Sequence, residues 1–269
     1  MVNQHSSFVG SIPENYDRYL GPMFFEPYAQ DIVQRVKVAD GGAVLEIACG
    51  TGIVTGHLRD SLPKGAKLVA SDLNEAMLAY AASKSWHGEA VQWKQADATS
   101  LPFDDASFDA IVCQFGVMFF PDKEAAVREA YRVIRPNGVF VFNVWDSIDQ
   151  NELAQIAHEA MSSFFEQDPP VFYTVPFGFH DPQKITDVLA AAGFNDPEIT
   201  VLPKTGISSS AADAAKGLIE GSPVIVEIKQ RGVSDIQEIE LRIADAIASR
   251  CGDHPVKSKM QALVITTRK

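Results

Sequence analysis

The chain has 269 residues, of which 46% are hydrophobic and 22% charged, and its formal net charge is −12. This composition is ordinary for a globular protein of one large domain, and no run approaches the roughly 18 apolar residues that a membrane helix needs. The acidic balance, with no Lys/Arg cluster longer than two residues, argues against nucleic acid and membranes as partners. The first ten residues have no basic or strongly apolar leader, so we expect a cytoplasmic protein.

The three cysteines, Cys49, Cys113 and Cys251, show no CxxC spacing. An odd and sparse count predicts reduced thiols, and it indicates neither a disulfide framework nor a zinc site. We therefore expect no metal ion in the functional site.

Hydrophobic periodicity predicts alternating strands and helices over the first half of the chain. Residues 1–22 are polar and rich in turn-forming residues, and the first helix is expected from Phe24 to Val38. The elements that follow are strands at 43–47, 67–71, 91–95, 108–114 and 139–145, and helices at 53–62, 74–84 and 123–134. Such alternation predicts an α/β protein with a doubly wound, mostly parallel sheet that is buried on both faces.

The pattern is looser after Trp145. A loop rich in proline and aromatic residues is expected at 168–182, and Gly193 is expected to end a helix in the left-handed conformation. The other predicted elements are helices at 151–165 and 182–192, strands at 198–202 and 260–267, and two helical pieces within 208–250 that are broken at 221–223.

The loop after the first strand carries the functional argument. The strand at 43–47 runs into a turn that contains Gly50 and Gly52, whose lack of Cβ lets a ligand approach the backbone closely. Asp72 ends the next strand, 20 residues after Gly52, where a carboxylate can accept hydrogen bonds from the ribose of a nucleoside. The alternative is that Asp72 only caps the helix at 74–84.

Four ordered segments carry a family resemblance: LEIACGTG, SDLNEAML, QADATSLPFDDASFDAIVCQFGVMFF and REAYRVIRPNGVFVFNVW. They resemble the motifs of class I S-adenosylmethionine-dependent methyltransferases, and in particular the quinone-biosynthesis (methyltransferase type 11) family. The resemblance covers residues 40–145 well, and 180–202 and 260–268 loosely. It implies a Rossmann-like, seven-stranded sheet whose last strand is antiparallel, and S-adenosylmethionine as the cofactor. Ala48 and Asn137 depart from the family, which commonly has glycine at both positions.

The resemblance also implies which residues bind the cofactor. Glu46 and Gln114 would lie by its methionine moiety, and the backbone at Ala48, Gly50 and Gly52 would cradle it. The other implied contacts are Asp72 to the ribose, Leu73 and Met77 over the adenine, and Asp97 with the Ala98 backbone at the adenine edge. The alternative for Asp97, which lies in a polar loop, is an Asx-turn.

The acceptor site is expected where aromatic residues meet the carboxyl edge of the sheet. The candidates are Tyr16 and Tyr19 from the N-terminal segment, Phe115, Met118, Phe119 and Trp145 after the fourth and fifth strands, and Phe177 and His180 from the first insertion. Aromatic walls suit a small apolar or aromatic metabolite, methylated on oxygen, carbon or nitrogen. The alternatives are core packing for the aromatic rings and a surface or capping role for His180.

We expect one domain over 1–269, with a core of 24–145, 181–203 and 258–269. Its cap would comprise 1–23, 146–180 and 204–257. No catalytic residue is assigned, because methyl transfer chiefly requires alignment and exclusion of water. A nicotinamide-dependent oxidoreductase and a non-catalytic, nucleoside-binding regulatory protein are the alternative functions, since Gly50, Gly52 and Gly56 approach a dinucleotide fingerprint that is one residue too long. The sequence specifies neither the acceptor nor the oligomeric state.

Overall fold

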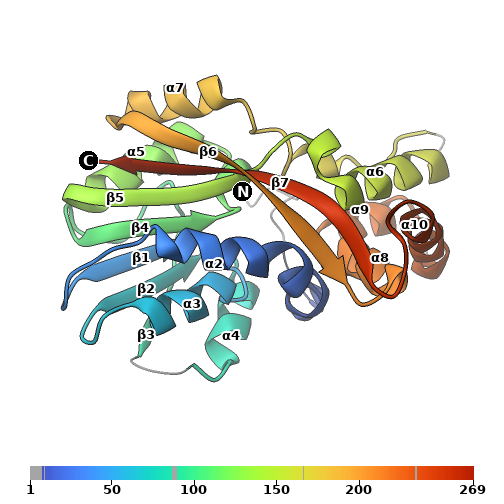
Figure 1. Ribbon diagram of the computed structural model, residues 1–269, viewed down its shortest axis with the longest axis horizontal. Helices are drawn as coiled ribbons and strands as arrows, with labels where there is room; N and C mark the ends of the chain where they lie inside the picture. Colours follow the sequence, from blue (N-terminus) through green and yellow to red (C-terminus); the bar gives the residue numbers. More distant parts are fainter. Residues whose placement is uncertain (1–7, 9, 87–89, 166, 234) are drawn as a thin grey trace.

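The computed structural model describes residues 8, 10–86, 90–165, 167–233 and 235–269. Seven strands form one sheet with the order β3-β2-β1-β4-β5-β7-β6 (Figure 1). Only β7 is antiparallel to its neighbours, β5 and β6, and the other neighbouring strands run parallel. The strands are β1 (Ala43–Ile47), β2 (Lys67–Asp72), β3 (Val91–Gln95), β4 (Phe108–Gln114), β5 (Ile134–Trp145), β6 (Asn195–Ser208) and β7 (Val256–Arg268). This topology confirms the predicted fold class.

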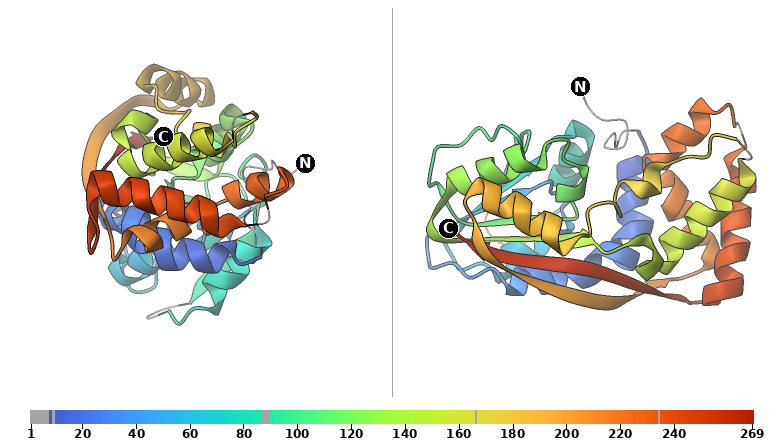
Figure 2. Two further views of the ribbon diagram at one scale, coloured as in Figure 1. Left: turned by 90° about the vertical axis from the view of Figure 1, so that its right-hand side faces the viewer. Right: turned by 90° about the horizontal axis from the view of Figure 1, so that it is seen from above.

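Helices cover both faces of the sheet and gather beyond one of its ends (Figures 1 and 2). The α-helices are α1 (Ile12–Asn15), α2 (Glu26–Gln34), α3 (Ile53–Ser61), α4 (Glu75–Ser83), α5 (Lys123–Val133), α6 (Glu152–Phe164), α7 (Pro182–Ala192), α8 (Ala211–Glu220), α9 (Val224–Gln230) and α10 (Ile236–Cys251). The remaining helical turns are the π-helix η2 (Tyr16–Phe25) and the 3₁₀ turns η3 (Val117–Phe119), η4 (Ile148–Gln150) and η5 (Phe172–Thr174).

The central strands are apolar on both sides because each side packs against helices. Val44 and Val112 belong to a buried cluster with α2 and α3, whereas Leu45 and Ile111 belong to a second cluster that includes α5 and α7. This alternation along β1 and β4 fixes their register, since a shift by one residue would exchange the two faces. The carboxyl ends of β1, β2 and β4 are thereby brought side by side.

The N-terminal segment differs from the prediction, because helical structure begins at Ile12 and not at Phe24. Leu20, Met23 and Phe25 are buried along η2 and supply an apolar face that the polar neighbours obscure in the sequence. Pro22 has no backbone N–H and lies inside this helix, whose π turns are wider than those of an α-helix.

The last two strands are also longer than predicted. β6 has 14 residues and β7 has 13, and they pair from Asn195↔Arg268 to Ser208↔Val256. Their far ends extend past the other strands toward α8 and α10 (Figure 1). The added residues 203–208 of β6 read PKTGIS, and Ile207 among them is exposed, so this part lacks the apolar run by which a buried strand is predicted. A further break around Gly232 divides the predicted pair of helical pieces into three helices.

The helices η2, α6, α8, α9 and α10 lie together at this end of the molecule (Figure 2). A hydrogen bond of 3.0 Å from the Asn15 side chain to Glu220 joins the N-terminal segment to α8.

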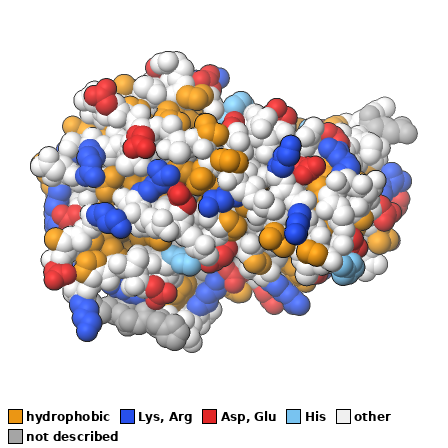
Figure 3. Space-filling model, viewed as in Figure 1, with side chains coloured by type: hydrophobic (Ala, Val, Ile, Leu, Met, Phe, Trp, Pro, Cys, Tyr) orange, Lys and Arg blue, Asp and Glu red, His pale blue; other side chains and the backbone are white. Residues whose placement is uncertain are grey.

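None of the helices in the described part of the chain combines the length and the apolar character that a membrane span needs. Acidic and basic side chains are interspersed over the face in Figure 3.

Candidate functional site

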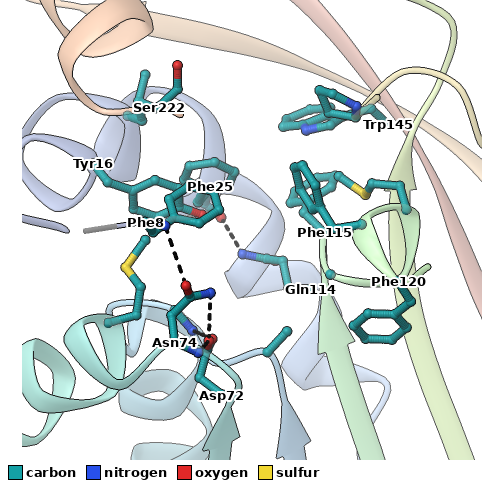
Figure 4. Close-up of a pocket in the computed structure, with 18 of the residues that line it drawn as sticks. Phe8, Tyr16, Phe25, Asp72, Asn74, Gln114, Phe115, Phe120, Trp145 and Ser222 are labelled. Carbon is teal, nitrogen blue, oxygen red and sulfur yellow. Dashed lines mark hydrogen bonds between the residues drawn. The ribbon is translucent and has the colours of Figure 1, made fainter. Parts of the chain in front are cut away.

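A cavity of about 360 Å³ lies at the carboxyl ends of β1, β2 and β4 and continues beneath the helices beyond them. One part of its wall comes from the loops after the strands, and the other part is aromatic. Figure 4 shows Asp72 and Asn74 on one side of the cavity, and the rings of Tyr16, Phe25, Phe115 and Trp145 on the other.

The glycine loop forms the first part of the wall. Ala48, Gly50 and Gly52 all have positive φ, at 55°, 55° and 84°, which turns the chain sharply from β1 into α3. Ala48 and Gly50 line the cavity. Ala48 occupies a left-handed conformation that glycine would adopt without strain, so the departure from the family pattern is tolerated by the small side chain.

Asp72 lies at the end of β2, lines the cavity, and is 6% exposed. Its Oδ2 accepts from the Gly50 N–H at 2.8 Å, and its Oδ1 accepts from the Asn74 N–H at 2.8 Å. Burial raises the pKa of this carboxyl group, against the lowering effect of these two bonds. Asn74, and not Asp72, is the N-cap residue of α4, so Asp72 holds the turn before the helix and faces the cavity as well.

Glu46 and Gly52, which the resemblance placed at the cofactor, do not line the cavity. Glu46 is 2% exposed and its Oε2 accepts from the Thr55 hydroxyl at 2.6 Å, so the side chain points to α3. Burial raises the pKa of Glu46 to about 8, with a further raising effect from Asp72. Gly52 is the N-cap of α3, and a Cβ at this position would lie 2.8 Å from the Trp86 ring.

The residues expected around the adenine lie together in the lining: Leu73, Met77, Asp97 and Ala98. The Oδ1 of Asp97 accepts from the Thr99 N–H at 2.8 Å and from the Thr99 hydroxyl at 2.7 Å. The Asx-turn is therefore present, and it holds a carboxylate that also borders the cavity.

The aromatic part of the wall contains stacked rings, and two of the pairs are closely spaced. The Tyr16 and Phe25 rings lie 4.6 Å apart between centroids at 13°, and the Phe115 and Trp145 rings lie 3.9 Å apart at 11°. Phe115 has a φ of 50°, which is uncommon for a bulky residue and typical of functional sites. Its N–H donates to the Asn143 side chain at 2.9 Å, which holds the backbone in this conformation.

Six of the predicted acceptor residues line the cavity: Tyr16, Phe115, Met118, Phe119, Trp145 and Phe177. Tyr19 and His180 do not. Tyr19 lies beside α8, and a Cβ added to Gly217 of that helix would be 2.7 Å from the Cβ of Tyr19. The Nδ1 of His180 lies 2.7 Å from the carbonyl oxygen of Phe177, so the ring is engaged by its own loop.

Sequence reasoning missed a larger set of lining residues, which come from segments far apart in the chain. They include Phe8, Leu20, Phe24, Phe25, Asn74, Gly116, Phe120, Asn151, Leu218 and Ser222. The spacing of four between Tyr16, Leu20 and Phe24 would have indicated one helical face. The residues at the end of α8 have no local signal, because only the tertiary fold brings them to the cavity.

The charged side chains in the described lining of the cavity are all acidic. Asp72 and Asp97 are its only carboxylates, and no lysine, arginine or histidine of the described chain contributes to it. Burial and the nearby Asp72 raise the pKa of Tyr16 well above its usual range, so its hydroxyl stays neutral. The cavity offers no counter-ion to an anionic ligand.

Comparison with known families gives a match for residues 45–142 to a methyltransferase domain. A demethylmenaquinone methyltransferase of Staphylococcus epidermidis is 27% identical over 204 residues, which are 69% of this chain and 83% of the relative. The enzyme of the same name from Thermus thermophilus is 41% identical over 99 residues, which are 36% of this chain and 44% of the relative.

Solved structures share the fold at low sequence identity. A putative methyltransferase of Bacillus halodurans gives a TM-score of 0.59 at 18% identity, covering 90% of this chain and 98% of its own. A phosphoethanolamine N-methyltransferase of Haemonchus contortus, solved with S-adenosylmethionine, gives 0.61 at 15% identity, covering 100% of this chain and 60% of its own. These comparisons support neither the oxidoreductase nor the regulatory alternative.

Proposed function

We propose that this chain, which is an S-adenosylmethionine-dependent methyltransferase and is similar to quinone-biosynthesis methyltransferases, methylates a small, uncharged, planar and apolar acceptor. The observation that carries the proposal is the cavity lining, which is aromatic and contains no cationic side chain within the described residues. Aromatic walls bind flat apolar rings by burying area.

The residues present fit the cofactor. Asp72 faces the cavity with a carboxylate that can accept from ribose hydroxyls, and Ala48 and Gly50 give a close backbone. Gln114 has a buried Oε1 that finds no partner among the described residues, which marks a place for a ligand donor. The bound cofactor would supply an electrophilic methyl group on a sulfonium centre.

The protein's own contribution is alignment and exclusion of water. Phe25, Phe115 and Trp145 are buried and form the wall against which a ring would pack. A closed, apolar wall keeps solvent from the reacting atoms and holds them in line. We propose that the described residues of the segments 1–23, 146–180 and 204–257 serve as the cap over this site; residues 1–7, 9, 166 and 234 lie outside the described part of the chain.

The names of the relatives support a quinone-type ring as the acceptor class, since both are demethylmenaquinone methyltransferases. The lining argues against a phosphorylated amine of the kind named for the Haemonchus structure, because nothing in it would pair with a phosphate. An electrophilic methyl group requires an electron-rich acceptor, so we propose oxygen, carbon or nitrogen of a ring in its reduced form.

The test is methyl transfer to 1,4-naphthalenediol and to phosphoethanolamine, detected by mass spectrometry. We expect product only from the diol. Phe119→Ala, in the cavity wall, should lower kcat/KM for the diol, by about tenfold for the loss of one aromatic contact. Phe164→Ala is the matched control, since Phe164 packs on Phe165 and Arg242 outside the lining. Product from phosphoethanolamine alone would refute the proposal.

A further inference from the structure

The side chain of Gln114, at the end of β4, forms a hydrogen bond to a segment outside the sheet. Its Nε2 donates to the carbonyl oxygen of Phe25 at 3.2 Å, which joins the sheet to the end of η2 (Figure 4). This bond fixes the orientation of the amide, because the reversed amide would set two oxygen atoms against each other. The Oε1 must therefore be the other atom, and it is buried with no hydrogen-bond partner among the described residues.

The position of this oxygen shows which ligand group can reach it. β1 and β4 run parallel with Glu46 beside Val112. Two residues further along the chain, Ala48 follows β1 and Gln114 ends β4. Gln114 is thus beside the start of the glycine loop. Asp72 is the last residue of β2, on the opposite side of β1.

S-adenosylmethionine has N–H donors at both ends, namely the adenine amino group and the methionine ammonium group. If the ribose binds at Asp72 and the adenine at Leu73, Met77 and Asp97, as the resemblance implies, the nucleoside would cover the ends of β2 and β3. The methionine end would then lie toward β4. An ammonium group is the stronger donor and has no competing cationic side chain in the described lining.

We propose that Gln114 couples cofactor binding to the wall of the acceptor site, with Oε1 accepting from the methionine ammonium group while Nε2 holds Phe25. Phe25 stacks on Tyr16 and lies 5.8 Å from Phe115 between ring centroids. A ligand that fixes the amide therefore also fixes η2 and the start of α2. The acceptor site is completed after the cofactor binds, and Gln114 acts as a positioning residue. The inference rests on the cofactor and not on the identity of the acceptor.

The test compares S-adenosylhomocysteine with 5′-methylthioadenosine, which keeps the nucleoside and lacks the amino-acid portion. Calorimetry should show that Gln114→Met lowers the affinity for S-adenosylhomocysteine by about tenfold or more. This is the effect expected when a hydrogen bond to a charged group is lost. The affinity for 5′-methylthioadenosine should stay within about twofold, because no nucleoside contact is removed. Gln92→Met is the control, since Gln92 is exposed on β3.

Hydrogen exchange of residues 16–34 measures the coupling. In the unmutated protein, S-adenosylhomocysteine should protect this segment more than 5′-methylthioadenosine does. Gln114→Glu keeps an acceptor for the ammonium group, but its ionised carboxylate cannot donate to the carbonyl oxygen of Phe25. This variant should therefore retain its affinity for S-adenosylhomocysteine and lose the extra protection of residues 16–34 from hydrogen exchange. This variant also decides the matter if Gln114→Met does not fold.

Three results would overturn the proposal: equal loss of affinity for both ligands in Gln114→Met, no loss for either, or equal protection of 16–34 by both ligands in the unmutated protein. Absence of S-adenosylhomocysteine binding would instead contradict the cofactor assignment. The expected affinities and protection without any methylation of a ring acceptor would contradict only the proposed acceptor class.

Discussion

The backbone N–H of Gly50 donates a hydrogen bond of 2.8 Å to Oδ2 of Asp72, which ties the loop after β1 to the end of β2. The other oxygen of the carboxylate accepts from Asn74 at the start of α4. One side chain therefore organises two neighbouring loops and also borders the cavity. Removing it should affect both folding and ligand binding.

Asp72→Ala should weaken binding of S-adenosylhomocysteine by about 1.5–3 kcal/mol, the range for a hydrogen bond to a charged group. The variant also leaves the N–H groups of Gly50 and Asn74 without their acceptor, so the free energy of unfolding should fall by about 1–3 kcal/mol. Calorimetry and urea denaturation measure the two effects. Unchanged affinity together with lowered stability would show that Asp72 only supports the fold.

The buried Glu46 should make the stability of the ligand-free protein depend on pH. Its pKa is raised to about 8 in the folded state, above the value of about 4.3 for an exposed glutamate. The stabilisation from the protonated form is complete below the lower value and is lost as pH rises through the higher one. Between pH 6 and pH 8.5 the free energy of unfolding should thus fall, by about 1–3 kcal/mol for a single group.

Glu46→Gln supplies the comparison, because the amide oxygen can still accept from Thr55 and does not ionise. Its urea denaturation curves at pH 6 and pH 8.5 should lack the part of the pH dependence that Glu46 contributes. The same pH slope in both proteins would contradict this account of Glu46.

The β4 loop approaches the glycine loop so closely that Gly116 has no room for a side chain. A Cβ there would lie 2.6 Å from Cβ of Ala48 and 2.7 Å from Sγ of Cys113. Gly116→Ala should therefore displace the glycine loop, lower the free energy of unfolding by about 1–3 kcal/mol and weaken S-adenosylhomocysteine binding. Thermal unfolding and calorimetry check both effects, and an unaltered protein would show that this contact relaxes freely.

The part of the fold around the glycine loop is predictable because its signals are local. The strand at 43–47, the turn after it and the acid at Asp72 lie within 30 residues of one another, and each has its own physical reason. The positive φ of Gly193 likewise matches the helix end expected there, whereas β5 begins at Ile134 and not at Val139 as predicted.

The acceptor side is less predictable, because it depends on packing between distant segments. The turn-forming residues of 1–22 do not predict the helix η2, and without it the sequence gives Tyr16 and Tyr19 equal standing. On η2 Tyr16 lines the cavity, whereas Tyr19 packs beside α8. Leu218 and Ser222 reach the cavity only because α8 packs on η2, as the close approach of Gly217 to Tyr19 and Leu20 shows. No sequence pattern within α8 predicts that contact.

The most direct test of the central claim is the transfer of an isotopically labelled methyl group from S-adenosylmethionine to two acceptors that differ in one charge. The acceptors are 1,4-naphthalenediol and 1,4-dihydroxy-2-naphthoate, and products are identified by mass spectrometry. A cavity lined by aromatic rings and by Asp72 and Asp97 predicts labelled product from the neutral diol and at least tenfold less from the carboxylate, roughly the penalty for leaving a charge unpaired. No product from the diol, or equal or faster transfer to the carboxylate, would contradict the claim.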